Sequence, residues 1–295
     1  MTVLNIFLLD RTGSMDSIKA STIESFNGYI AAQQNSDIAD EILFSLITFD
    51  SISTDTVYSR AKINDVKPLD NYTFQPRGAT PLIDACCKTI LAVDKWAAET
   101  PAAKIAVTFM TDGEENASRK WKLPDLHSMI KERVAAGWQI NFMGAGIDAY
   151  QAASAMGIGA AATMSYDKGD IVASRAAFAA SAQNMRAWVR GDAVKMEFTD
   201  EQKSQAGDAF HKPVESAQQT KISGAVWQAP SPCVPYAASC AANKAMTVAP
   251  DRRHVQDDEK LIRMQRAAAD LTSATGAKMP LSPLAQARKS ALKRR

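Results

Sequence analysis

The stretch "TVLNIFLLDRTGSMDSI", residues 2–18, joins a continuous apolar run to a cluster of oxygen-bearing side chains. Such a run is expected of a central strand that is covered on both faces of its sheet. The run ends at Asp10, and Thr12 and Ser14 follow at alternate positions. Apolar residues then recur at helical spacing, which predicts a helix over 14–34 with Ser14 as its N-cap. The stretch therefore predicts a strand and a helix joined by a turn rich in side-chain oxygens.

Outward from this unit, strands and helices alternate through the first two-thirds of the chain. Strands are predicted at 41–49, 52–60, 104–111, 138–146 and 161–166, and helices at 80–99, 123–136, 148–155 and 171–191. The first two of these strands are separated by a tight turn, which predicts a hairpin and one antiparallel edge strand. The alternation predicts an α/β fold: a doubly wound, Rossmann-like, mostly parallel sheet with helices on both faces.

Composition and charge divide the chain into two unlike parts. The 295 residues are 46% hydrophobic and 22% charged, which is typical of a soluble chain with one large domain and an additional segment, or with two small domains. The alternating pattern fades after about residue 192, so we expect an α/β domain over 1–192 and an extension over 193–295 that is largely irregular, partly helical and flexible. Residues 213–295 carry 13 Lys and Arg against 6 Asp and Glu, although the whole chain has a net charge of only +2.

The N-terminal sequence and the cysteines bear on location. The opening residues have no basic leader, and their apolar run is too short for a signal peptide or a membrane span. We therefore expect a cytoplasmic protein that does not contact a membrane. The four cysteines form neither a CxxC pair nor a disulfide-like spacing, so no zinc site or disulfide framework is predicted; they are Cys86, Cys87, Cys233 and Cys240.

Polar residues follow the predicted strands where a binding site is expected. In an open parallel sheet, ligands bind outside the carboxyl ends of the strands. Asp10, Thr12 and Ser14 follow the first strand, Asp112 follows the strand that ends at 111, and Thr80 opens a helix. Two carboxylates and three hydroxyls are thus predicted to meet at one rim. An all-oxygen set of this kind suits a hard divalent cation, Mg²⁺ or Mn²⁺.

These motifs resemble the metal-ion-dependent adhesion site (MIDAS) of von Willebrand factor A (vWA) domains. The resemblance rests on DxTxS at 10–14, the lone Thr80 in "GATPL" and "TDG" at 111–113, and it covers roughly residues 2–190. It implies that Thr12 and Ser14 bind the metal directly and that Thr80 does so directly or through water. It also implies that Asp10 and Asp112 hold the metal largely through waters. Thr12 is a departure, since the family most often has serine there, but the hydroxyl is kept.

The resemblance also implies a function. In the family, the metal keeps one coordination position open for a carboxylate of a partner protein, so we expect protein binding through an Asp or Glu of the partner and no enzymatic activity. The chain resembles intracellular bacterial and phage vWA proteins. Such proteins often work beside a MoxR-type AAA+ ATPase, which makes such an ATPase a candidate partner.

Two alternatives stay open. "DRTGS" also resembles the "DKTGT" loop of P-type ATPases and their haloacid-dehalogenase relatives, in which Asp10 would be a nucleophile and Mg²⁺ would balance the phosphate charge. That reading needs a lysine and a second acidic motif, which "TDGEEN" matches only loosely, and it gives Thr80 no role. The basic extension could instead bind nucleic acid. Its basic residues are scattered and carry no recognised motif, so nucleic acid is the least favoured partner.

Overall fold

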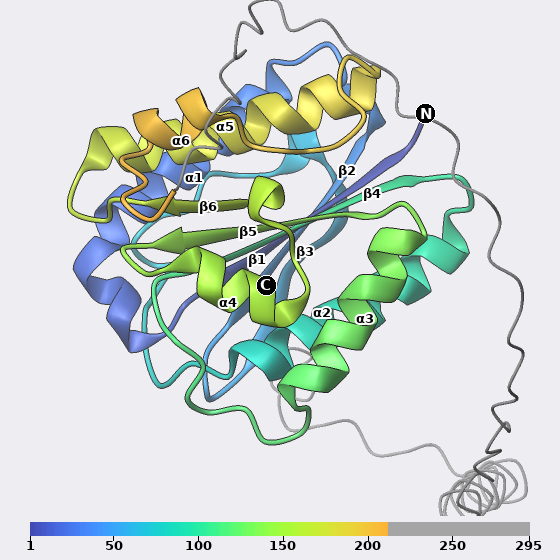
Figure 1. The fold of residues 1–295 in the computed structure, drawn as a ribbon. Coiled ribbons are helices and arrows are strands. Elements are labelled where there is room, and N and C mark those ends of the chain that lie inside the picture. Colours follow the sequence, from blue (N-terminus) through green and yellow to red (C-terminus); the bar gives the residue numbers. More distant parts are fainter. Residues whose placement is uncertain (212–295) are drawn as a thin grey trace, which may run out of the picture. The chain divides into compact units, whose positions relative to one another are not determined.

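The apolar run near the N-terminus forms strand β1 (Val3–Asp10), and all of its residues are buried. The computed structural model describes residues 1–211, in which β1 lies inside a six-stranded sheet of order β3-β2-β1-β4-β5-β6 (Figure 1). β1 pairs in parallel with both of its neighbours, β2 and β4. A strand in this position has no exposed face, which explains its uninterrupted apolar sequence. The α/β fold with a mostly parallel sheet is thus confirmed.

The elements follow the order predicted from the sequence. The other strands are β2 (Ile42–Phe49), β3 (Thr54–Lys62), β4 (Lys104–Thr111), β5 (Gln139–Ala145) and β6 (Thr163–Tyr166). The α-helices are α1 (Lys19–Gln34), α2 (Leu82–Glu99), α3 (Leu123–Ala135), α4 (Ala149–Met156), α5 (Ile171–Arg190) and α6 (Asp200–Gln205). β3 pairs antiparallel with β2 at one end of the sheet, as the hairpin signal predicts.

The first helix begins later than predicted, and this changes the role of one residue. Gly13–Ile18 form a 3-10 helix, and α1 starts only at Lys19. The Ser14 side chain caps neither helix, so its predicted role as an N-cap is wrong. Its hydroxyl donates a hydrogen bond to Asp112 Oδ1 at 2.6 Å instead. The turn after β1 thus contributes this hydroxyl to the end of the sheet.

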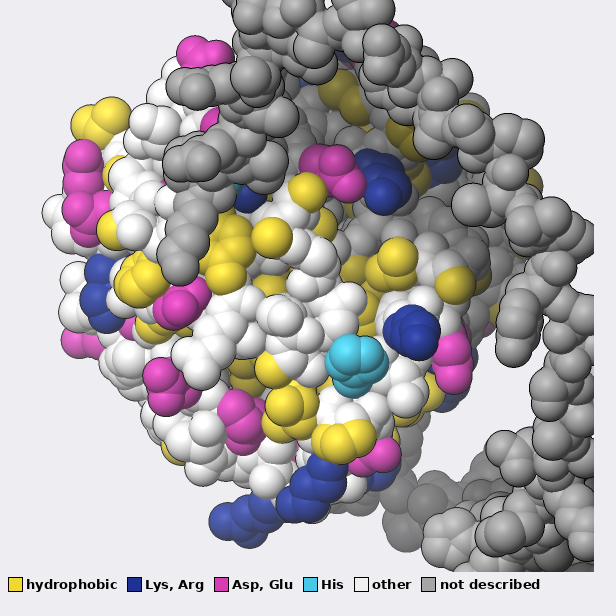
Figure 2. All heavy atoms as spheres, viewed as in Figure 1, with side chains coloured by type: hydrophobic (Ala, Val, Ile, Leu, Met, Phe, Trp, Pro, Cys, Tyr) yellow, Lys and Arg dark blue, Asp and Glu magenta, His cyan; other side chains and the backbone are white. Residues whose placement is uncertain are grey.

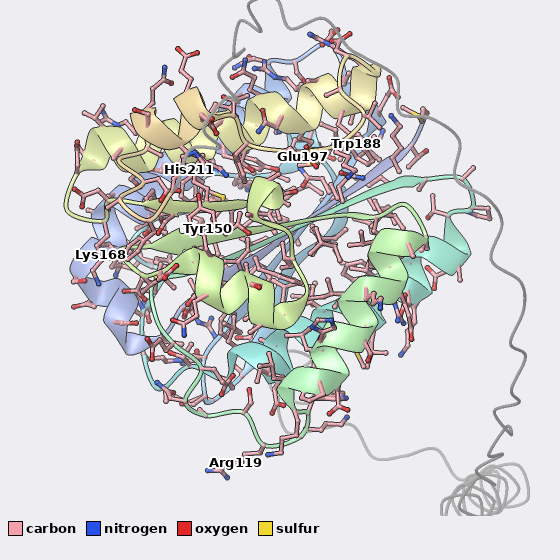
Figure 3. The ribbon with its side chains drawn as sticks, in the orientation of Figure 1. Arg119, Tyr150, Lys168, Trp188, Glu197 and His211 are labelled. Atoms are coloured by element: carbon pink, nitrogen blue, oxygen red, sulfur yellow. The ribbon has the colours of Figure 1, made fainter. Side chains whose placement is uncertain are left out.

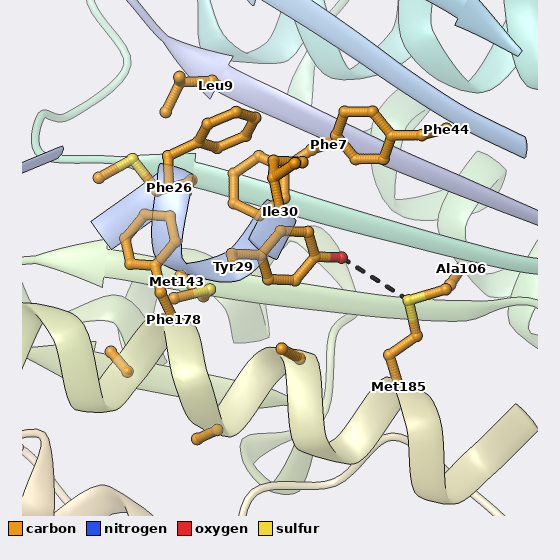
Figure 4. Close-up of a cluster of buried hydrophobic side chains, with 14 of the residues drawn as sticks. Phe7, Leu9, Phe26, Tyr29, Ile30, Phe44, Ala106, Met143, Phe178 and Met185 are labelled. Atoms are coloured by element: carbon orange, nitrogen blue, oxygen red, sulfur yellow. Dashed lines mark hydrogen bonds between the residues drawn. The ribbon is translucent and has the colours of Figure 1, made fainter. Parts of the chain in front are cut away.

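Two apolar layers hold β1 in place. Helices α1 and α5 cover one face of the sheet, and α2, α3 and α4 cover the other (Figure 1). In the first layer, the Phe7 ring lies 5.4 Å from the Phe26 ring, 5.3 Å from the Tyr29 ring and 5.8 Å from the Phe178 ring (Figure 4). Each fully buried aromatic side chain of this kind stabilises the fold by about 1.5–3 kcal/mol. This packing fixes the position of Asp10 at the end of β1.

Packing continues past residue 192, the expected end of the domain. Met196 and Phe198 are 2% and 5% exposed and belong to the apolar layer under α5. The Asn141 side chain donates a hydrogen bond of 2.7 Å to the Met196 carbonyl, and Lys203 in α6 donates one of 2.9 Å to the Ala160 carbonyl. The segment 193–211 is therefore part of the folded body. The expected irregularity and flexibility of 212–295 lie outside the described residues.

Two of the four cysteines lie within the described residues. Cys86 and Cys87 are buried free thiols, whereas Cys233 and Cys240 lie outside the described residues. Within residues 1–211, no helix is both long and apolar enough to cross a membrane. Acidic and basic side chains are interspersed on the face shown in Figure 2.

Candidate metal centre

The structure brings all five predicted site residues to one rim of the sheet. Asp10 is the last residue of β1, and Asp112 directly follows β4. Since β1 and β4 are parallel neighbours, their carboxyl ends meet at the same edge. Thr12 and Ser14 extend from the turn after β1, and Thr80 comes from the loop that leads into α2. The topology therefore gathers side chains from three separate loops.

Hydrogen bonds connect four of these side chains in a row. The Thr80 hydroxyl donates to Thr12 Oγ1 at 3.2 Å, and Thr12 Oγ1 lies 3.2 Å from Ser14 Oγ. Ser14 Oγ donates to Asp112 Oδ1 at 2.6 Å. Because the Ser14 proton is directed to the carboxylate, the Thr12 proton is left for Ser14. Three hydroxyl oxygens and one carboxylate thus lie within hydrogen-bond distance of their neighbours.

Asp10 lies behind the hydroxyls and anchors the turn. It is fully buried; its Oδ1 accepts a hydrogen bond from the Thr12 backbone amide at 2.6 Å, and its Oδ2 accepts one from the Thr111 hydroxyl at 2.5 Å. Burial raises the pKa of Asp10 from 3.8 to about 6, although the hydrogen bonds from Thr111 and Thr12 oppose the shift. Thr111 is absent from the predicted site. Its only sequence signal is its place directly before Asp112 in "TDG".

Asp112 provides the observation that bears most directly on a cation. Its Oδ2 atom is buried and has no hydrogen-bond partner within residues 1–211. The ammonium of Lys168 pairs with it loosely at 3.9 Å, beyond hydrogen-bond distance. A buried carboxylate oxygen without a hydrogen bond is costly, and a bound cation would offset that cost. Two carboxylates and three hydroxyls suit a hard divalent ion, so the residues present fit Mg²⁺ or Mn²⁺.

The donor set contains fewer carboxylates than hydroxyls and includes no sulfur or imidazole ligand. Within the described residues, no three His, Cys, Asp or Glu side chains gather as metal ligands. The two carboxylates at this rim are accompanied by hydroxyls instead. A cation held here would therefore keep more of its positive charge than one neutralised by three or four acids.

The loops around the hydroxyls are fixed to one another. The Thr80 backbone amide donates to Asn116 Oδ1 at 2.8 Å, and the Asn116 amide donates back to the Thr80 carbonyl at 3.0 Å. A methyl group at Gly113 would lie 3.4 Å from both Ser14 Oγ and Thr80 Oγ1. Glycine at 113 thus keeps the space between these hydroxyls open. Asn116 is a further residue that the sequence did not single out.

An ion-pair cluster around the buried Asp50 stabilises the other side of the rim. The Asp50 side chain is completely buried, and its Oδ2 lies 2.7 Å from Arg11 Nη2 and 2.9 Å from Arg77 Nε. Burial by itself would raise the pKa of Asp50. Hydrogen bonds from Arg77, from the Ser53 and Ile52 amides and from Arg11 together hold that pKa below 3.8. The Arg11 and Arg77 charges are therefore already paired with Asp50.

A largely apolar hollow, which Glu114, Glu115 and Asp148 also line, adjoins the rim. It encloses about 410 Å³ beside Gly113, between the first residues of α2 and α3 and helix α4. Apolar side chains that line it include Leu82, Ile83, Leu123 and Met156. A surface next to the candidate cation site is thus shaped to receive an apolar side chain.

Comparisons with known proteins find similarity at the level of solved structures. No family model matches the sequence, and no curated protein matches it. Similar structures include the pilus adhesin SpaC from Lactobacillus rhamnosus GG (13% identity, TM-score 0.49) and a von Willebrand factor type A protein from Catenulispora acidiphila (15%, 0.43). Another is the manganese-loaded TRAP protein of Plasmodium vivax (17%, 0.42).

The extent of these similarities is limited. The matches cover 63%, 60% and 59% of this chain, and they span 30%, 41% and 71% of SpaC, the Catenulispora protein and TRAP, respectively. The chain thus spans less than half of the first two proteins. At these identities the likeness concerns the vWA-like fold alone, and the ligand set is inferred from this chain's own residues.

Proposed function

We propose that this chain is a protein-binding module that holds Mg²⁺ or Mn²⁺ at the rim formed by Asp10, Thr12, Ser14, Thr80 and Asp112. The observation that carries the proposal is the buried Asp112 Oδ2, which has no hydrogen-bond partner within residues 1–211. It belongs to a carboxylate whose other oxygen already accepts a bond from Ser14. A cation beside these atoms would satisfy the orphan oxygen and use the neighbouring hydroxyls as neutral ligands.

The chemistry proposed for the site is capture of a carboxylate. A cation with neutral ligands attracts an additional negative group, which here would be an Asp or Glu side chain of a partner protein. The adjoining apolar hollow beside Gly113 would add contact area around that acid. A MoxR-type AAA+ ATPase in the cytoplasm is the class of partner that we propose to test first.

Binding without catalysis is favoured over phosphoryl transfer. Lys168 supplies a lysine near Asp112, as a phosphotransferase would need. Asp10, however, is fully buried, and both of its oxygens accept hydrogen bonds from within the chain. A nucleophile must present a free oxygen to its substrate, so this environment supports an anchoring role for Asp10.

Metal binding is tested by calorimetry on the purified full chain. We expect Mn²⁺ and Mg²⁺ to bind at one site and to raise the melting temperature, because a ligand specific to the native state stabilises that state. Ser14→Ala and Asp112→Asn should abolish binding. Ser17→Ala is the matched control, because Ser17 lies in the same 3-10 helix and its hydroxyl, within residues 1–211, bonds only to the Ser14 carbonyl. Equal metal affinity in Ser14→Ala, Asp112→Asn and the parent would refute the site.

Partner binding and catalysis need separate measurements. Capture of a partner from a lysate by the immobilised chain should require Mg²⁺ and be lost in EDTA and with Thr80→Ala. Small phosphate esters should not be hydrolysed with Mg²⁺ present. A phosphorylated Asp10 detected by mass spectrometry would favour the phosphotransferase alternative instead.

A further inference from the structure

Lys168 approaches the candidate metal centre from the loop after β6, the strand at one edge of the sheet. It follows the end of β6, two strands away from β4 in the sheet order. Its ammonium lies 3.9 Å from Asp112 Oδ2. In Figure 3, Lys168 lies beyond the arrowhead of β6, at the end of the sheet where the strands terminate. A fourth loop thus brings a positive charge to the rim.

The position of Lys168 is fixed by its surroundings. A Cβ atom at Gly146 would lie only 2.7 Å from Lys168 Cγ and Cδ, so the lysine stem lies directly against the glycine backbone. Gly146 has φ +66°, a conformation that other residues rarely adopt. The neighbouring Asp167 is fixed as well: its amide donates to the Ala206 carbonyl at 3.1 Å, and its Oδ1 accepts from the Gly169 amide at 2.8 Å. The first bond ties the turn that carries Lys168 to the end of α6, and the second closes the turn itself.

Among the described residues, the Lys168 ammonium forms a loose ion pair with Asp112 but no hydrogen bond. A separation of 3.9 Å is too long for a hydrogen bond, and within residues 1–211 this ammonium makes none. Its side chain is 41% exposed, so solvent reaches it at the rim. By contrast, the guanidinium groups of Arg11 and Arg77 are already bonded to Asp50. Once a cation neutralises Asp112, the three N–H donors of Lys168 remain for an incoming group.

We infer that Lys168 is a specificity-determining residue and that the rim selects a protein segment with two neighbouring carboxylates. One carboxylate would bind at the metal, and the second would pair with the Lys168 ammonium. The inference rests on the proposed function, because the first carboxylate needs the cation. Two positive charges at the rim favour a segment with two negative charges over a segment with one.

The test compares two short peptides on the Mg²⁺-loaded full chain. One peptide carries a single glutamate between glycines, the other carries two adjacent glutamates, and both are capped at their ends. Binding is followed by NMR titration of the isotope-labelled protein. We expect the parent to bind the diacidic peptide about fivefold more tightly than the monoacidic one. Lys168→Met should remove this preference, and Lys168→Arg should retain it. Mg²⁺ affinity should rise in Lys168→Met, because a positive charge 3.9 Å from Asp112 Oδ2 is removed.

A matched control separates local contact from general electrostatics. Lys19, at the start of α1, donates to the Asn71 carbonyl, and Lys19→Met removes the same charge without touching Asp112. This variant should keep the preference for two acids. An equal preference in Lys168→Met and the parent would overturn the role of Lys168 while leaving the metal site standing. If neither peptide bound the Mg²⁺-loaded parent, the proposed function and the inference would both fall.

Discussion

The Thr111 hydroxyl donates a 2.5 Å hydrogen bond to Asp10 Oδ2, although the two residues are 101 positions apart in the sequence. The bond joins the carboxyl ends of β4 and β1 directly below the candidate metal centre. Thr111 Oγ1 also accepts a hydrogen bond of 3.1 Å from the Gly113 amide. One threonine thus satisfies a buried carboxylate and fixes the loop that carries Asp112.

Replacing this threonine should destabilise the protein measurably. Thr111→Val keeps the shape but leaves a buried Asp10 oxygen without its donor, so we expect a loss of about 1–3 kcal/mol in the free energy of unfolding. Thr108→Val in the same strand is the control, because the buried Thr108 hydroxyl has no partner within residues 1–211. That variant should be neutral or slightly stabilising. Urea unfolding of both variants without metal measures the difference, and equal losses would contradict the role of Thr111.

The Asp50 cluster predicts a stability that depends on pH. The pKa of Asp50 is lower in the folded chain than the usual 3.8, so its contribution is present above the unfolded pKa and is lost as the pH falls through the folded value. Asp50→Asn should therefore cost about 2–4 kcal/mol near pH 7 and progressively less below about pH 4. Chemical denaturation across this range tests the trend. A constant cost from neutral to acidic pH would count against it.

Asp55 provides the comparison for Asp50. It pairs with Arg11 at 2.8 Å, but its side chain is 48% exposed. A partly exposed pair is screened by water and contributes little. Asp55→Asn should therefore change the free energy of unfolding by less than about 1 kcal/mol at neutral pH. A loss as large as that of Asp50→Asn would show that burial is not what distinguishes the two acids.

The segment after α5 should behave as part of the core. Phe198→Ala removes a side chain that is 5% exposed, and we expect a loss of about 3–5 kcal/mol. Val194→Ala is the control in the same segment. Because Val194 is 89% exposed, this substitution should hardly change the free energy of unfolding. Thermal unfolding of the full chain distinguishes them. A small effect of Phe198→Ala would restore a domain boundary near residue 192.

Gly113 should control access to the hydroxyls. Gly113→Ala places a methyl group 3.4 Å from both Ser14 Oγ and Thr80 Oγ1, so we expect Mn²⁺ affinity to fall several-fold while the fold is retained. Gly159→Ala serves as the control, because a Cβ there meets nothing within 4 Å. Calorimetry gives the affinities, and circular dichroism reports on the fold. Unchanged Mn²⁺ affinity in Gly113→Ala would place the metal away from these hydroxyls.

The sequence by itself determined the architecture and the members of the candidate site. Unbroken apolar runs such as 2–9 indicate strands that are covered on both faces. Segments with helical spacing alternate with these strands, and a parallel sheet with helices on both faces is the arrangement that buries the apolar side chains of both kinds of element. Parallel strands end at one edge, so the polar residues that follow them had to meet there. The placement of Asp10, Ser14 and Asp112 at one rim therefore follows from the sequence alone.

Tertiary structure alone decided how those residues are supported. The bond from Thr111 to Asp10, the burial of Asp50 between Arg11 and Arg77, and the approach of Lys168 to Asp112 join side chains from different loops. Their partners depend on the register of neighbouring strands and on the space left by residues such as Gly146. Local periodicity carries no information about either, because it records which face of an element is apolar and not which side chain lies opposite.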